Sequence, residues 1–256
     1  MDALVRLFAA RDGLLERYEP TPWGAIVADA RFPLIYDANY ARVDRDSPPL
    51  TAGALMDALA PALEAAGCPQ LHVVLMDAVA SSRLLPRLET LGGETARDTV
   101  MRHELGAPAR PSHPVEEVRS FDDRFWGEVR ATVPGLGLVD PAIMQRFVDQ
   151  FVRWERQVLV PGGQRWFRVR MDGETAGLGA LFVAGDAAYV DDVFTFERFR
   201  RRGVAGALVL RLVEEARRAG ARDIMLLADE PDPIRLYGSL GFAPAGEIVN
   251  WQRPAV

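Results

Sequence analysis

The sequence has no lysine, only one cysteine and no long hydrophobic run. Its 30 basic residues are all arginine, which we attribute to a biased base composition of the genome rather than to function. Cys68 has no second thiol for an intramolecular disulfide or a metal site, so we expect a reducing, cytoplasmic compartment. Nowhere do about eighteen apolar residues follow one another, so we expect neither a membrane span nor a membrane partner.

The motifs of several nucleotide-binding and hydrolytic proteins are also missing. There is no G-K-[ST] sequence of the Walker type, and no G-x-G-x-x-G follows an expected strand. G-x-S-x-G, the nucleophile turn of many hydrolases, does not occur. His72, His103 and His113 share no metal-ligand spacing, so we expect packing roles for them and no metal site.

The composition indicates a folded chain with an acidic balance of charge. Hydrophobic residues make up 49% and charged residues 26% of the 256 residues, as in ordinary globular proteins. The formal net charge of -6 disfavours a nucleic-acid partner and suits an enzyme that acts on small molecules. A chain of this length can form two domains of ordinary size.

A proline-rich segment divides the chain into two patterned regions. GAPARPSHP, residues 106–114, contains three prolines, which fix φ, lack an N–H group and restrict the preceding residue. We predict a linker here, with a first domain over residues 1–105 and a second over residues 115–256.

The two regions repeat one order of elements: helix, strand, helix and turn. In the first region this order runs through ALMDALAPALEAAG, LHVVLMD and LLPRLETLGG; in the second it runs through ALVLRLVEEARRAG, DIMLLAD and IRLYGSLGF. The alternative is a chance similarity between two amphipathic helices. A true repeat predicts two domains of related fold.

The second region has the pattern of a mixed α/β domain. Strands are expected at 166–171, 177–183 and 187–195, with tight turns at Asp172-Gly173 and Gly185-Asp186. An amphipathic helix follows Gly203 and ends before Gly220, and a buried strand follows at 223–228, which makes a βαβ unit. Two earlier helices are expected at 122–132 and 141–154.

One segment of the second region, VDDVFTFERFRRRGVAGALVLRL, has the pattern of a phosphate site. Free N–H groups at a helix start and the positive end of the helix dipole hold anions. Gly203 is expected to let a phosphate approach with no Cβ in the way, and Arg200, Arg201 and Arg202 to add charged donors. Arginine-rich helix starts are also common solvated surfaces, and a basic patch at 198–202 is a nucleic-acid alternative that the overall acidity disfavours.

The run from Arg200 to Ala205 resembles the [QR]-x-x-G-x-[GA] signature of the GNAT superfamily of N-acetyltransferases. IRLYGSLGF resembles that family's later L-Y-x-x-x-G-F motif, and the resemblance spans 115–253, most strongly 189–242. It implies two GNAT-like lobes in tandem, each a mixed, mostly antiparallel sheet with flanking helices. It also implies that the strands at 187–195 and 223–228 splay apart to admit the pantetheine arm of acetyl-CoA.

The same resemblance implies the residues of the site. The backbone of 194–196 would pair with the arm, and the amides of 201–206 would take the pyrophosphate. The expected cofactor-binding residues are therefore Phe194, Thr195, Phe196, Arg200, Arg201, Arg202, Gly203, Val204, Ala205 and Gly206.

Tyr237 matches the family's frequent general acid, which protonates the leaving thiolate. Asp232 as N-cap and Pro233 at the first helical position would start its helix, and Gly241 would end it. The alternative for Tyr237 is a ring packed in the core. Asp191 and Asp192 are candidates for the base; simple alternation directs at most one of them at the acceptor, although a β-bulge could change that.

The chain departs from the family's pattern in two places. Glu230 stands where many members have an asparagine, and a carboxylate cannot donate the hydrogen bonds of an amide. The first region lacks R-x-x-G-x-A, has Pro48 and Pro49 in the corresponding loop, and has Leu88 in the place of Tyr237. We therefore expect the first lobe to be degenerate, with no cofactor of its own.

Together these observations predict an enzyme that moves an acetyl group from acetyl-CoA directly to the amine of a small molecule. A non-catalytic acyl-CoA sensor and a protein N-acetyltransferase are the alternatives. We expect a monomer or homodimer and no metal.

Overall fold

The computed structural model describes residues 1–46, 49–104, 106, 111–133 and 142–254, and forms two compact units. Unit 1 comprises residues 1–99 and 246–256, and unit 2 comprises residues 100–245. The sequence predicts that 246–256 belong to the second domain, whereas in the structure 246–254 group with unit 1 and Val249–Pro254 pair with the strand Gln70–Leu75. Residues 107–110 of the expected linker, Pro48 and the expected helix start at 141 lie outside the described residues.

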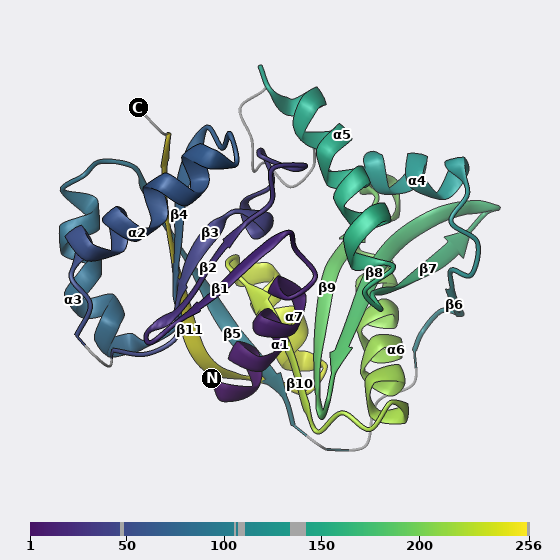
Figure 1. Cartoon of the computed structure of the whole chain (residues 1–256). Helices are drawn as coiled ribbons and strands as arrows, with labels where there is room; N and C mark the ends of the chain where they lie inside the picture. The colour runs from purple at the N-terminus through teal and green to yellow at the C-terminus, as the bar shows by residue number, and fades with distance from the viewer. Residues whose placement is uncertain (47–48, 105, 107–110, 134–141, 255–256) are drawn as a thin grey trace. The chain divides into compact units, whose positions relative to one another are not determined.

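Unit 1 is a mixed sheet flanked by helices (Figure 1). Its strands lie in the order β1-β2-β3-β4-β11-β5, with β3 and β4 parallel and the pairs β1/β2, β2/β3 and β4/β11 antiparallel. Its elements are α1 (Asp2–Asp12), β1 (Arg17–Thr21), β2 (Gly24–Ala28), the 3-10 helix η1 (Tyr36–Ala38), β3 (Tyr40–Val43), α2 (Ala52–Ala65), β4 (Gln70–Leu75), α3 (Ala78–Glu89), the first part of β5 (Glu94–His103) and the last part of β11 (Phe242–Pro254).

Strands β3 and β4 of unit 1 stay paired to their carboxyl ends. Ala41–Val43 lie opposite Val73–Leu75, and the N–H of Met76 donates to the carbonyl of Val43 across 2.9 Å. Helix α2 begins at an N-cap, Thr51, whose hydroxyl accepts from the N–H of Ala54. The pairing of β3 with β4 up to Val43 and Leu75 leaves no opening between these two parallel strands.

Unit 2 is a second mixed sheet with helices on both faces. The strand order is β5-β10-β9-β8-β7-β6; β9 and β10 are parallel, and the pairs β6/β7, β7/β8 and β8/β9 are antiparallel. Besides the last part of β5 and the first part of β11, its elements are β6 (Val115–Glu117), α4 (Asp123–Arg130), α5 (Met144–Trp154), the π-helix η3 (Glu155–Leu159), β7 (Arg165–Met171), β8 (Glu174–Ala184), β9 (Ala187–Thr195), the 3-10 helix η4 (Glu197–Phe199), α6 (Val204–Arg218), β10 (Asp223–Ala228) and α7 (Pro231–Ser239).

The two faces of the unit 2 sheet are set by alternation along β7. Trp166 contacts the ring of Phe125 on α4, with centroids 5.8 Å apart, while its neighbour Phe167 belongs to the core beneath α6. Successive residues of a strand point to opposite faces. Helices α4 and α6 therefore cover opposite faces of this sheet.

Two glycines of β8 bring α6 close to the sheet. A Cβ at Gly177 would meet Val204 Cγ1 at 2.6 Å and the carbonyl oxygen of Phe194 at 2.7 Å. A Cβ at Gly179 would meet Leu212 Cδ1 at 3.1 Å. The close approach of α6 thus depends on the missing side chains of β8.

The expected fold class is confirmed: the chain is α/β, with mixed, mostly antiparallel sheets and flanking helices. The turns at Asp172-Gly173 and Gly185-Asp186 join β7, β8 and β9 as predicted, and φ is positive at Asp172, Gly173 and Gly185. Helix α6 ends at Arg218, and Gly220 follows with a φ of 89°. The sequence analysis did not predict helix α1 or strands β1, β2, β3, β5, β6 and β11.

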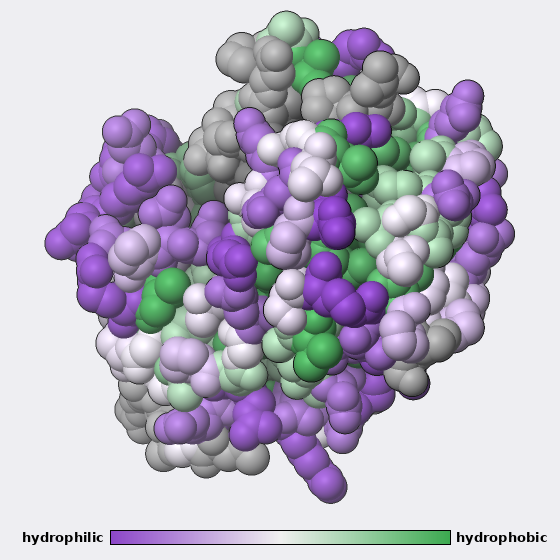
Figure 2. Space-filling model, turned by 90° about the vertical axis from the view of Figure 1, so that its left-hand side faces the viewer, coloured by the Kyte–Doolittle hydropathy of each residue, from purple (hydrophilic) through white to green (hydrophobic). Residues whose placement is uncertain are grey.

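The face of the molecule drawn in Figure 2 is mostly hydrophilic, with apolar residues in scattered patches. Among the residues that the structure describes, the exposed large hydrophobic side chains are Met1, Val79 and Leu91. Over the residues described, no helix is both long and apolar enough to cross a membrane.

Candidate active site

The two parallel strands of unit 2 separate halfway along their length. Residues Ala187–Tyr189 of β9 pair with Asp223–Met225 of β10, and no pairing continues beyond them. Both strands go on, to Thr195 and Ala228. The backbone edge of β9 that faces β10 is therefore left without a strand partner over its second half, as the family resemblance implied.

A β-bulge lies in the separated half of β9. Its register with β8 shifts between Leu178, opposite Phe194, and Ala180, opposite Asp191, so β9 has one extra residue. Asp192 has a φ of 50°, and its N–H donates to Oδ1 of Asp191 across 3.0 Å. The bulge that was considered as a possibility is therefore present, and it replaces simple alternation at the two aspartates.

The end of β9 presents backbone groups on the side that β10 has left. The N–H of Phe196 donates to the carbonyl of Ala176 in β8 across 3.1 Å. Backbone groups alternate along a strand, so those of Thr195 face the opposite edge. The Thr195 carbonyl accepts from Nε of Arg200 there, across 3.4 Å.

The turn between η4 and α6 is exposed and holds two residues at positive φ. Arg201 has a φ of 60° and Gly203, the N-cap of α6, has a φ of 81°. The first bond of the helix runs from the N–H of Ala207 to the carbonyl of Gly203, so the amides of 204–206 precede the helical ladder. Gly203 has no side chain with which to cap them. The turn can therefore offer main-chain donors to an anion.

The role expected for the missing Cβ of Gly203 is wrong. A Cβ at this residue would meet Ser112 Oγ at 2.9 Å and His113 Nε2 at 3.6 Å, so that side of the residue is already occupied. Glycine is required by the positive φ and by the close approach of residues 112 and 113, rather than by an incoming phosphate.

The arginines of the turn have different partners. Arg202 lies 3.8 Å from the carboxylate of Asp172, and its guanidinium lies 5.6 Å from the ring centre of Phe199. Arg200 is bound to the end of β9, as described above. The side chain of Arg201 is exposed.

Tyr237 lies on α7, within electrostatic reach of Asp191 in β9 and of Asp229 just after β10. Burial, then the charges of Asp191 and Asp229, raise the pKa of its hydroxyl to about 12. Its ring also packs near Phe242, with centroids 6.2 Å apart. The two interpretations of Tyr237, a ring packed in the core and a proton donor, are therefore compatible. The ring is held by packing while the hydroxyl stays protonated.

The start of α7 differs from the prediction. The N-cap is Glu230 and the first helical residue is Pro231, two residues earlier than the expected pair Asp232 and Pro233. Both prolines fit because the first turn needs no intrahelical N–H donors. Gly241, with a φ of 93°, follows the helix end as expected.

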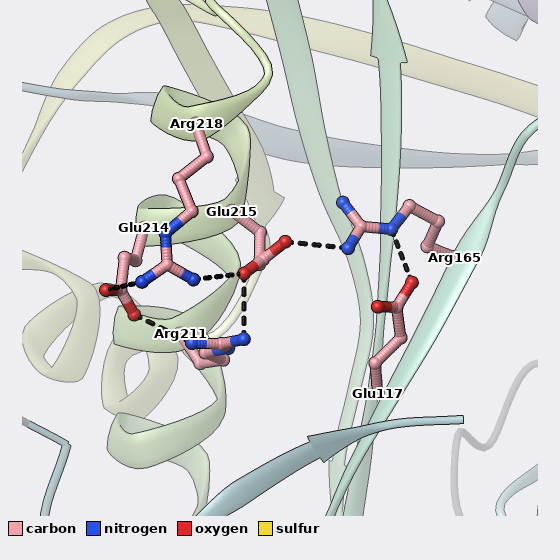
Figure 3. Close-up of polar contacts among 6 residues, drawn as sticks. All are labelled: Glu117, Arg165, Arg211, Glu214, Glu215 and Arg218. Atoms are coloured by element: carbon pink, nitrogen blue, oxygen red, sulfur yellow. Dashed lines mark hydrogen bonds and ion pairs between the residues drawn. The ribbon is translucent and has the colours of Figure 1, made fainter. Parts of the chain in front are cut away.

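A network of charged residues fixes α6 to the sheet (Figure 3). Arg165 of β7 donates to Glu117 of β6 across 2.7 Å and to Glu215 of α6 across 2.6 Å. Arg211 and Arg218 of α6 bind the other oxygen of Glu215 at 2.8 and 2.6 Å. Burial opposes ionisation of Glu215, but these arginines outweigh it and hold its pKa below the ordinary value. Helix α6, which follows the N-cap Gly203, is thus anchored through Glu215 in its fourth turn.

The histidines do not come together in the structure. His103 packs edge-to-face against Phe242, with centroids 4.9 Å apart, and burial and Arg217 lower its pKa. His113 instead contacts the turn before α6, with Nε2 2.6 Å from the carbonyl oxygen of Arg202. Within the described ranges, no group of three or more His, Cys, Asp or Glu side chains is placed to hold a metal ion.

Residues 138–242 match the model of the Acetyltransferase (GNAT) family. The matched segment includes β9, the turn at Gly203, β10 and α7. Comparison with curated proteins finds no match.

Solved structures share the fold over most of the chain. A functionally unknown conserved protein from Staphylococcus epidermidis is 13% identical over 92% of each chain, with a TM-score of 0.67. A GCN5-related N-acetyltransferase from Kribbella flavida is 18% identical, with a TM-score of 0.56 over 84% of this chain and 79% of that one. A tandem GNAT protein from the clavulanic acid biosynthesis pathway is 18% identical, with a TM-score of 0.52 over 84% of this chain and 75% of that one. At these identities the likeness shows the fold.

Proposed function

We propose that the protein is an acetyltransferase that moves an acetyl group from acetyl-CoA directly to the amine of a small molecule. The observation that carries this proposal is the separation of β9 from β10 beside the exposed turn at Gly203, within the segment that matches the GNAT family. A strand edge from which β10 has separated, followed in the sequence by helix amides that precede the first intrahelical bond, suits a ligand with an amide-containing arm and a diphosphate.

In this proposal, the cofactor is held mainly by the backbone. Phe194, Thr195 and Phe196 form the strand end that pairs with the pantetheine arm, with the backbone groups of Thr195 facing the separated edge. Residues 201–206 present amides to the diphosphate. Arg200 orders the strand end through its bond to the carbonyl of Thr195. Arg201, with its exposed side chain, is the arginine of the turn best placed to add a charged contact. Glu230 lacks the amide that many family members have at this place, so its contact with the cofactor would be lost.

The chemistry requires a base and an acid. The acceptor ammonium loses a proton, its nitrogen attacks the thioester carbon, the C–S bond breaks, and the thiolate gains a proton. Asp191 or Asp192 would take the first proton, directly or through water, and Tyr237 would donate to the sulfur. A phenol with a pKa of about 12 is fully protonated at neutral pH, as an acid must be before the reaction.

We further propose that the first lobe is a degenerate copy that binds no cofactor. Its parallel strands β3 and β4 remain paired to their ends, so no arm can insert between them. At the start of α2, the N–H of Ala54 already donates to the hydroxyl of Thr51, so this amide has a partner within the chain. Leu88, in the place of Tyr237, is fully buried.

Two measurements test the proposed function. Calorimetric titration with CoA is expected to give one site per chain; two sites would contradict the degenerate first lobe, and none would contradict the cofactor site. Thiol release from acetyl-CoA, followed with a panel of small amines and with peptides bearing a free amino terminus, is expected to show turnover with a small amine. Binding without turnover would favour an acyl-CoA sensor, and turnover with peptides alone would favour a protein N-acetyltransferase.

A further inference from the structure

Two residues outside the family signature contact the turn before α6. The hydroxyl of Ser112 donates to the carbonyl of Gly203 across 3.3 Å. Nε2 of His113 lies 2.6 Å from the carbonyl oxygen of Arg202 and must donate, because a carbonyl oxygen only accepts. Both residues come from the end of the segment expected to be the linker, about ninety residues earlier in the chain.

These two bonds determine where the amides of the turn point. In a trans peptide the C=O and the following N–H are antiparallel. Holding the carbonyl of Arg202 therefore directs the N–H of Gly203 away from His113. The carbonyl of Gly203 is held by Ser112 and also by the N–H of Ala207 in α6. Holding it directs the N–H of Val204 away from Ser112. The amides of the turn are thus aimed at the side opposite to residues 112 and 113.

The turn needs such outside contacts because its backbone is strained. Arg201 is a non-glycine residue at a φ of 60°, a conformation that persists only where the surroundings hold it. Gly203, the N-cap of α6, has no side chain and so makes no capping bond to the first amides of the helix. Ser112 and His113 occupy the space that a Cβ at Gly203 would fill, and they contact the turn on that side.

We propose that Ser112 and His113 are positioning residues for the binding of the cofactor's diphosphate. They touch neither the reacting atoms nor the thioester; they act through the carbonyls of Arg202 and Gly203, which orient the amides. This inference rests on the proposed function, since it assigns the turn a diphosphate ligand. It also extends the cofactor site to the end of the segment that joins the two halves of the sequence.

The test compares donors with and without a diphosphate. Acetyl-CoA has the diphosphate, and S-acetyl-pantetheine has the same thioester and arm without it. In His113→Phe and Ser112→Ala, we expect KM for acetyl-CoA and Kd for CoA to rise about threefold to tenfold, the effect of one lost hydrogen bond. The value of kcat at saturating acetyl-CoA, and kcat/KM with S-acetyl-pantetheine, should not change.

Two further variants serve as controls. His113→Gln keeps an N–H donor at nearly the same place and should restore most of the affinity. Ser82→Ala removes another exposed hydroxyl that donates to a backbone carbonyl, that of Val79 on α3, and should leave both donors unaffected. Circular dichroism and thermal melting show whether each variant is folded.

Each outcome decides a different question. Equal losses with both donors would mean that residues 112 and 113 maintain the fold rather than the diphosphate site, and unchanged affinity for CoA in His113→Phe and Ser112→Ala would remove their role altogether. If the wild-type protein neither binds CoA nor releases thiol, the proposed function itself fails, and the assigned diphosphate with it.

Discussion

Asp191 on β9 and Tyr237 on α7 are electrostatically coupled: the carboxylate adds to burial in raising the pKa of the phenol to about 12. Asp229, just after β10, acts in the same direction. Three elements that are separate in the sequence, β9, β10 and α7, therefore converge on one hydroxyl. A phenol with a pKa of about 12 stays protonated at neutral pH, as the proposed acid must be.

Replacing the hydroxyl tests its role as the acid. Tyr237→Phe keeps the ring that packs near Phe242 and should lower kcat about a hundredfold or more, because a positioned acid contributes about 10² to 10⁴ in rate. KM for acetyl-CoA should change little. Tyr18→Phe, on β1 of unit 1, is the matched control and should leave the kinetics unchanged. A Tyr237→Phe variant with normal kcat would mean that the tyrosine only packs.

The coupling itself is testable by titration. Because the negative charge of Asp191 raises the pKa of Tyr237, Asp191→Asn should lower that pKa. Ionisation of the phenol, followed by ultraviolet difference spectra against Tyr237→Phe, should then occur at lower pH than in the wild type. Wild-type kcat should show no loss of the acid below about pH 11. An unchanged phenol titration in Asp191→Asn would show that the two groups are not coupled.

The close packing of α6 on Gly177, one of the two glycines of β8 beneath this helix, can be tested by a stability measurement. Gly177→Ala places a Cβ 2.6 Å from Val204 and 2.7 Å from the Phe194 carbonyl, so β9 or α6 must shift. We expect a loss of about 1 to 3 kcal/mol in the free energy of unfolding, measured by urea denaturation. Gly53→Ala on α2, where only the hydroxyl of Thr51 lies nearby at 4.0 Å, should be neutral or slightly stabilising. Equal effects of the two changes would contradict the described packing of α6.

The sequence predicted best the parts of unit 2 that depend on local pattern. The turn at Asp172-Gly173 and the alternating apolar residues of β7 to β9 are signals within a few residues, and α6 has a full amphipathic stripe. Strand β11 is different. Its residues 242–245 belong to unit 2, whereas 249–254 pair with β4 of unit 1. This pairing joins segments about 180 residues apart, so no local pattern contains it.

At the candidate site, too, contacts between distant segments could not be predicted from local pattern. The Gly203 turn and Tyr237 were found through motifs, whereas Ser112 and His113 were missed because their partners, the carbonyls of Gly203 and Arg202, have no side-chain signature. The start of α7 was misplaced by two residues because Asp232 and Pro233 match the preferences of an N-cap and first position as well as Glu230 and Pro231 do, or better.

The charged network on α6 predicts a pH dependence of stability. Arg165, Arg211 and Arg218 hold the pKa of Glu215 below its ordinary value of 4.5 in the folded state. The folded state therefore binds this proton less readily than the unfolded chain, so the stabilisation is present above pH 4.5 and is lost as pH falls through the folded pKa.

Glu215→Gln should therefore destabilise the protein at neutral pH and flatten the fall of stability in acid, as measured by thermal melting across pH. Glu174→Gln breaks an ion pair with Arg198 in which both side chains are at least half exposed, and should change stability by less than about 1 kcal/mol. An acid dependence that is the same in Glu215→Gln and wild type would contradict the role of this carboxylate.

A crystal structure of the protein with acetyl-CoA tests the central claim most directly. We predict the pantetheine arm between the separated halves of β9 and β10, with diphosphate oxygens within hydrogen-bond distance of amides in 201–206 and the sulfur near the hydroxyl of Tyr237. A cofactor bound elsewhere on the chain, or a diphosphate that makes no contact with these amides, would contradict the account.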